Sequence, residues 1–157
     1  MKPLSISDHR HVEAAKGWCQ LQAFNDANAE LEEITAEHWI HPDALEVRWS
    51  IYANMGKWDG ALDLADVFNH LAPDDPKGCI YTASSLHELG KSAEAMELLL
   101  AAAKQFPAER TIRFAIAWLY CSSKRLDLAR QWVASAMKCP IQLLSTADSL
   151  KANRTGG

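Results

Sequence analysis

Apolar and polar residues alternate along this 157-residue chain with the spacing of helices rather than of strands. Ala, Leu, Glu, Lys and Gln are frequent, whereas runs of Val, Ile and Thr are absent, which favours helix. We expect Ser7 or Asp8 to cap the first helix, and Asp74 or Asp75 to cap the fifth. The pattern predicts an all-α protein with helices near residues 8–22, 25–38, 42–55, 58–71, 75–89, 92–105, 109–123 and 126–138.

Large and small residues recur at an interval of 34 residues. With Pro42 as position 1 of a unit, the other units begin at Asp8, Pro76 and Arg110. Position 20 is alanine in all four units, as expected where two antiparallel helices approach closely. Position 15 is Gly56 or Gly90 in the middle units, where glycine takes a left-handed cap conformation without steric cost. The four alanines are Ala27, Ala61, Ala95 and Ala129.

This arrangement resembles the tetratricopeptide repeat over residues 8–140. The terminal units depart from the pattern, because Gln22 and Lys124 replace the turn glycine. The resemblance implies a single domain over residues 1–157, folded as a right-handed α-solenoid of antiparallel helix pairs. Its units are expected at 8–41, 42–75, 76–109 and 110–140. After Pro140, an apolar helical face predicts a capping helix over 141–152 that covers unit four; this face carries Leu143, Ala147 and Leu150.

Charge is distributed unevenly, although the net charge is only −4. Residues 1–78 hold 6 Lys/Arg and 14 Asp/Glu, whereas residues 79–157 hold 10 Lys/Arg and 6 Asp/Glu. Solvated helix faces explain this asymmetry; the alternative is a dipolar scaffold that orients a charged partner. The four cysteines lack CxxC spacing, and no secretory signal or membrane-length apolar run is visible. We therefore expect free thiols, a cytoplasmic location and no membrane partner.

Candidate chemistry is sparse. No phosphate-binding glycine loop or hydrolase motif occurs, so we expect neither an enzyme nor a cofactor. Two clusters contain metal-ligand residue types, but we interpret both as surface polarity, since structural metals normally need four ligands. Basic residues near Trp132 are too few, in an acidic chain, to predict nucleic-acid binding. The clusters are Asp8, His9 and His11, and His38, His41 and Asp43; the basic residues are Lys124, Arg125 and Arg130.

The resemblance implies a concave groove lined by positions 2, 5, 9 and 12 of each first helix. The carboxylate clamp with which some members hold acidic chaperone tails is not matched. Val12, Lys16, Val47 and Tyr81 occupy four of its positions, and only Lys77 agrees. The expected groove residues are Val12, Lys16, Asp43, Glu46, Ser50, Lys77, Ile80, Ser84, His87, Phe114 and Trp118, with Tyr81 beside them; His9, Cys19, Ala53, Thr111 and Cys121 complete the four positions.

We expect a non-catalytic module that binds a peptide or protein segment, in an adaptor or chaperone-like role. Phe114 and Trp118 are one helical turn apart and would anchor an apolar ligand group, while Asp43 and Glu46 would face a basic one. Alternatively, the two aromatic residues pack against the C-terminal helix. The competing hypothesis for the whole chain is a structural protein that self-associates weakly through its convex face or exposed ends.

Overall fold

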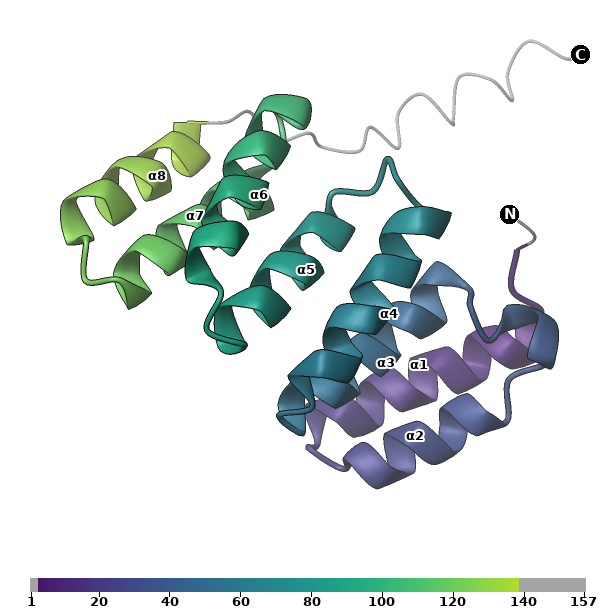
Figure 1. The fold of residues 1–157 in the computed structure, drawn as a ribbon. Helices are drawn as coiled ribbons and strands as arrows, with labels where there is room; N and C mark the ends of the chain where they lie inside the picture. The colour runs from purple at the N-terminus through teal and green to yellow at the C-terminus, as the bar shows by residue number, and fades with distance from the viewer. Residues whose placement is uncertain (1–2, 139–157) are drawn as a thin grey trace, which may run out of the picture.

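The computed structural model describes residues 3–138, which form helices and connecting turns without a strand (Figure 1). The helices are α1 (Ile6–Gln20), α2 (Phe24–Glu32), α3 (Pro42–Asn54), α4 (Trp58–Leu71), α5 (Lys77–Glu88), α6 (Ser92–Gln105), α7 (Arg110–Ser122) and α8 (Leu126–Lys138), with a 3-10 helix η1 (Ala36–His38) after α2. The expected capping helix over 141–152 lies outside the described residues.

The helices form consecutive pairs, α1/α2, α3/α4, α5/α6 and α7/α8, and each pair packs against the next (Figure 1). We call α1, α3, α5 and α7 the first helices, and α2, α4, α6 and α8 the second helices. The row runs from α1 and α2 at one end to α7 and α8 at the other. The prediction of an all-α, tetratricopeptide-like solenoid is confirmed.

The turn between the two helices of every pair contains one residue with a left-handed backbone conformation. Position 15 has φ of 59° at Gln22, 69° at Gly56, 81° at Gly90 and 58° at Lys124. In each turn, the N–H of position 16 donates to the carbonyl of position 11, over 2.8–3.0 Å. This bond satisfies a carbonyl that the end of the first helix leaves unpaired. The turn therefore has one geometry in all four pairs, with or without glycine.

The core follows the pairs in three clusters of buried residues. One lies among α1, α2 and α3, one among α5, α6 and α7, and a smaller one joins α3, α4 and α5. The four position-20 alanines are buried, as expected. In the joining cluster, Tyr81 stacks on Trp49 at a ring-centroid distance of 4.5 Å and meets Phe68 edge-on at 5.4 Å. Trp49 Nε1 also donates to Ser85 Oγ over 3.1 Å.

Unit one closes through a buried polar network instead of proline. The Asp8 carboxylate accepts hydrogen bonds from Thr35 N (2.9 Å), Ser5 Oγ (2.7 Å) and His38 Nδ1 (2.7 Å). Asp8 and His38 are both buried, so their interpretation as surface polarity is wrong. The expected helix over 25–38 ends at Glu32, because the backbone at Thr35 turns toward the Asp8 carboxylate.

Two helix caps also differ from expectation. Ser5, rather than Ser7 or Asp8, caps α1, and its Oγ accepts from Asp8 N over 3.1 Å. Pro76 precedes α5 and provides no side-chain cap. Asp75 still satisfies one free donor of that helix, since its Oδ1 accepts from Lys77 N over 2.9 Å.

The left-handed turn residues should respond in opposite directions to substitution. Gln22→Gly removes a side chain from a conformation that costs about 1–2 kcal/mol for a non-glycine residue, so we expect a net gain near 0.5–1 kcal/mol. Gly56→Ala should cost about 1 kcal/mol, although no atom lies within 4 Å of the new Cβ. Urea unfolding measures both changes.

The control for these variants is Gly17→Ala, which lies inside α1 in equally open space. Alanine is the better helix former, so this variant should gain about 0.5–1 kcal/mol. If Gly17→Ala and Gly56→Ala change stability in the same direction, the left-handed turn does not explain the effect.

The Asp8 network predicts acid sensitivity. The Thr35 N–H, followed by Ser5 and His38, holds the pKa of Asp8 well below its ordinary value. The charged carboxylate therefore stabilises the fold above about pH 4, and this contribution is lost as the pH falls further. Asp8→Asn should melt below wild type at pH 7, and the difference should narrow toward pH 3.

The matched control is Glu13→Gln. Its carboxylate pairs with Lys16 on the surface of α1, where water screens the interaction. This variant should differ little from wild type at either pH. A constant Asp8→Asn deficit between pH 7 and pH 3 would contradict the proposed role of the charge.

Candidate functional site

The candidate site is the set of outward side chains on the first helices, which we call the first-helix face. In unit one, Lys16 is partly exposed and its Nζ donates to Glu13 Oε1 over 2.7 Å. Val12 is fully buried in the core among α1, α2 and α3. The expectation that Val12 lines a binding surface is therefore wrong. His9 is exposed, and Cys19 is half-buried, where burial raises the pKa of its thiol.

An ion pair joins α3 to α5 in the middle of the face. Lys77 Nζ donates to Glu46 Oε2 over 2.7 Å, and this bond raises the pKa of Lys77. Tyr81 is buried, and burial followed by the nearby Glu46 carboxylate raises the pKa of its hydroxyl. Tyr81 is thus largely a core residue that offers little surface to a ligand, and its hydroxyl lies near the expected groove residue Glu46. The Glu46 carboxylate therefore already interacts with both Lys77 and Tyr81 within the protein.

The remaining residues of α3 differ in what they offer a ligand. Ser50 Oγ donates to the carbonyl of Glu46 over 3.0 Å, so its hydrogen is used within the helix. Ala53 is at the border of burial. The Asp43 side chain is half-exposed, and its Oδ2 lies 3.7 Å from His41 Nδ1. Asp43 is therefore the more available of the two carboxylates on α3.

Aromatic side chains gather where α5 meets α7. The rings of His87 and Trp118 meet edge-on with centroids 4.7 Å apart, and His87 Nδ1 lies 2.8 Å from Ser92 Oγ. Trp118 is 44 % exposed and Phe114 is 39 % exposed. Both rings thus present apolar surface beyond the packing contacts of residues 3–138. Packing against residues 141–152 lies outside the described residues.

A basic residue that the sequence did not single out completes this aromatic group. The Arg110 guanidinium carbon lies 6.0 Å from the centroid of the Phe114 ring, at the outer limit of a cation–π contact. Arg110 Nε also donates to the carbonyl of Ala136 over 3.1 Å, which fixes the side chain to the end of α8. On α5, Ile80 and Ser84 are half-buried, whereas Thr111 and Cys121 of α7 are exposed.

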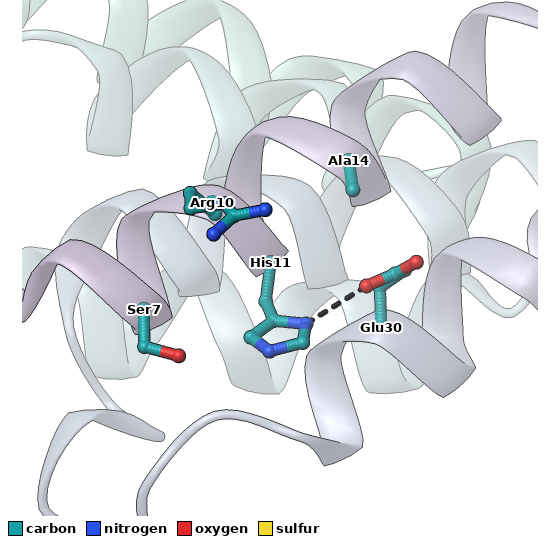
Figure 2. A pocket seen from close by; sticks show the side chains of 5 residues that line it. All are labelled: Ser7, Arg10, His11, Ala14 and Glu30. Atoms are coloured by element: carbon teal, nitrogen blue, oxygen red, sulfur yellow. Dashed lines mark hydrogen bonds and ion pairs between the residues drawn. The ribbon is translucent and has the colours of Figure 1, made fainter.

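A polar pocket lies away from this face, between α1 and α2 (Figure 2). It has a volume of about 320 Å³. His11 Nδ1 and Glu30 Oε2 lie 2.8 Å apart on one side, and the histidine lowers the pKa of Glu30. The Arg10 side chain lies above His11 in this view. The lining residues are Ser7, Arg10, His11, Ala14 and Glu30.

Comparison with the later units explains why this pocket is present: in those units, the equivalent space is filled by packing between helix pairs. Arg10 stands at position 3 of unit one. In the later units position 3 is Ala44, Gly78 or Ile112, and each is buried against the second helix of the preceding pair. Unit one has polar groups where those units have small or apolar ones. The pocket is therefore the place that a preceding helix would occupy, lined with groups that water can solvate.

Residues 3–138 contain no group of three or more His, Cys, Asp or Glu side chains placed to hold a metal ion. Among these residues, the Asp8–His38 bond joins one histidine cluster to the other, and the edge-on contact between the His38 and His41 rings lies within the second cluster. Within the same range, no helix combines the length and apolar character needed to cross a bilayer.

No family model matches the chain, and no curated protein matches it. Several solved structures, however, have a similar fold. A crystal structure of MamA aligns over 93 % of this chain and 81 % of its own, with 14 % identity and a TM-score of 0.64. MamA 41-end from Desulfovibrio magneticus RS-1 aligns over 84 % and 75 %, with 11 % identity and a TM-score of 0.65. Identities this low establish a shared helical-repeat fold and no more.

The contacts of Glu46 predict a stability effect that Asp43 should lack. Glu46→Gln weakens the bond to Lys77, and because the pair is partly exposed we expect a loss of about 0.5–1 kcal/mol. Asp43→Asn should change stability by less than about 0.5 kcal/mol. Chemical unfolding of each variant, and of both combined with Lys77→Gln, measures the coupling. Equal effects of Glu46→Gln with and without Lys77 would contradict the pairing.

Proposed function

We propose that this chain is a tetratricopeptide-type interaction module that binds a peptide or protein segment along its first-helix face, without catalysis. The observation that carries the proposal is the exposure of Phe114 and Trp118 on α7, with the Trp118 ring in contact with His87 of the neighbouring first helix. Aromatic side chains in such positions commonly supply most of the binding energy of an interface. Such an exposed face would suit an adaptor or a small chaperone-like role.

The ligand that fits this face has an apolar group and a basic group. The apolar group would lie on Phe114 and Trp118. The basic group would lie near Asp43, because Glu46 is already bonded to Lys77. Arg110, over the Phe114 ring, would favour a carboxylate or a carbonyl oxygen close to the apolar anchor. The predicted ligand is therefore a segment of mixed character rather than a uniformly acidic tail.

Three unpaired thiols, Cys19, Cys79 and Cys121, are consistent with a reducing compartment, and we place the module in the cytoplasm on that basis. Weak self-association through the exposed ends remains the competing function. Exposed apolar residues on α8 favour it, and they include Val133 and Met137.

A peptide selection tests the proposal directly. A phage-displayed library of random peptides is panned on the full chain, and bound sequences are measured by calorimetry against variants. Trp118→Ala and Phe114→Ala should each weaken binding at least about tenfold, because truncating an aromatic anchor typically costs 2 kcal/mol or more. Asp43→Lys should mainly slow association, most clearly at low salt.

Val67→Ala is the matched control, since Val67 on α4 is as exposed as Phe114 but belongs to a second helix. It should leave the affinity unchanged. Peptides that bind the Phe114 and Trp118 variants as tightly as wild type would place the binding surface elsewhere. A chain that selects no peptide but shows concentration-dependent light scattering would favour the self-association alternative.

A further inference from the structure

One arginine of the pocket between α1 and α2, which we call the α1/α2 pocket, has no partner. Arg10 is exposed and forms no hydrogen bond or ion pair with another residue of the range 3–138. The carboxylate of Glu30 does not neutralise it, because Glu30 is paired with His11 at 2.8 Å. The lining therefore carries an uncompensated guanidinium at position 3, where the later units bury a small or apolar residue.

The α4/α5 junction shows what a helix in this pocket would bring to Arg10. A Cβ added at Gly78, position 3 of unit three, would clash with Oδ1 of Asn69, at position 28 on α4. Asn69 Nδ2 also donates to Oγ1 of Thr82, at position 7, over 2.9 Å. Position 28 of a second helix thus faces positions 3 and 7 of the first helix that follows. In unit one these positions are Arg10 and Ala14, which both line the pocket.

The α2/α3 junction shows how this fold uses an arginine at such a contact. Arg48, at position 7 of unit two, donates through Nη2 to the carbonyl of Leu31 over 3.2 Å. Its Nη1 lies 3.5 Å from Oε1 of Glu32. Both partners belong to the last turn of α2, where helix carbonyls lack intrahelical donors. The arginine therefore binds the end of the preceding helix through a carbonyl and a carboxylate together.

Arg10 is in register for the same kind of contact with a longer helix. It stands at position 3, one helical turn (about 6 Å) nearer the start of its helix than Arg48. The helix that Arg48 binds, α2, ends at position 25, whereas α4 and α6 end at position 30, about 7.5 Å farther along. Because a second helix runs toward the start of the next first helix, the two offsets match. Arg10 is thus placed for the last turn of a helix as long as α4.

The end of α8 from a second copy of the chain does not fit this contact. Position 28 on α8 is Met137, and the next residue is the basic Lys138. The carbonyl of Ala136 already accepts a hydrogen bond from Arg110 Nε over 3.1 Å. End-to-end stacking of two copies would therefore bring a methionine and a lysine to Arg10, and its charge would be buried without a partner. The occupant of the pocket must supply the carboxylate.

We propose that the α1/α2 pocket binds the C-terminal turn of a helix from a partner protein, and that this helix carries an aspartate or glutamate at the position equivalent to Asn69. The carboxylate accepts two hydrogen bonds from the Arg10 guanidinium. The Ser7 hydroxyl, which also lines the pocket, can donate to a free carbonyl of the same turn (Figure 2). A dianionic phosphate fits less well, because Glu30 adds negative charge to the lining.

Three helical peptides test the proposal. Each copies Trp58–Leu71 of α4, is amidated at its C-terminus, and carries a hydrocarbon staple between residues 63 and 67, whose side chains are exposed in the protein. They contain Asn69, Asn69→Asp or Asn69→Lys. In fluorescence anisotropy with the full chain, the Asp peptide should bind at least about tenfold more tightly than the Lys peptide, because only the carboxylate pairs with Arg10.

Charge reversal identifies the arginine. In Arg10→Glu the order should reverse, so that the Lys peptide binds more tightly than the Asp peptide. In Arg10→Gln the two affinities should lie within about threefold of each other. Arg130→Gln is the matched control, since Arg130 is also exposed but lies on α8, and it should keep the wild-type preference. Trp118→Ala should keep that preference as well, because Trp118 belongs to the first-helix face.

Four results would overturn the proposal. They are failure of all three peptides to bind wild type, the same order of affinities in Arg10→Glu as in wild type, loss of the preference in Trp118→Ala, and displacement of the Asp peptide by inorganic phosphate but not by equal acetate. Peptide affinity that falls with rising protein concentration, together with a dimer by light scattering, would assign the pocket to a second copy instead. Binding at Phe114 and Trp118 is measured with other peptides, so this test can fail while the proposed function stands.

Discussion

A single left-handed residue in each helix pair is the constraint on which the rest of this structure depends. It reverses the chain in a few residues and returns the second helix along the first with the position-20 alanine facing inward. Gln22 and Lys124 adopt this conformation at a cost of about 1–2 kcal/mol each. Burying one leucine or isoleucine returns about 1.5–3 kcal/mol. A pair that buries several such residues therefore keeps the turn even without glycine.

Much of the fold could be predicted because its signals are local. The helices over 58–71 and 92–105 match their predicted limits, and α8 begins at its predicted residue, Leu126. These limits depend on the turn before each helix and on the length of the repeat, which are both visible in nearby residues. The end of α2 could not be predicted, because it depends on the Asp8 carboxylate, 27 residues from Thr35 in sequence. Periodicity describes which side of a helix is apolar, but it does not identify distant polar partners.

The positions of some of the expected site residues could also be predicted from the repeat. His87 and Trp118 are in contact, because neighbouring first helices bring position 12 of one unit beside position 9 of the next. The burial of Tyr81 was not predictable, because its ring stacks on Trp49 in the joining cluster. Glu46 was expected to face a ligand, but its carboxylate already accepts a hydrogen bond from Lys77 of the next unit. The repeat position thus predicts where the backbone of a residue lies. The contacts of its side chain depend on the neighbouring residues in the adjacent unit.

The Asp8 network also has a consequence for synthesis on the ribosome. All of its partners lie within the first 38 residues, and the first cluster of the core is nearly complete once α3 has emerged. The first pair can therefore close before the later pairs exist, and it offers them a preformed surface on which to fold. Growth from that end matches the direction in which the chain is made, so each new pair meets an ordered neighbour instead of another unfolded segment.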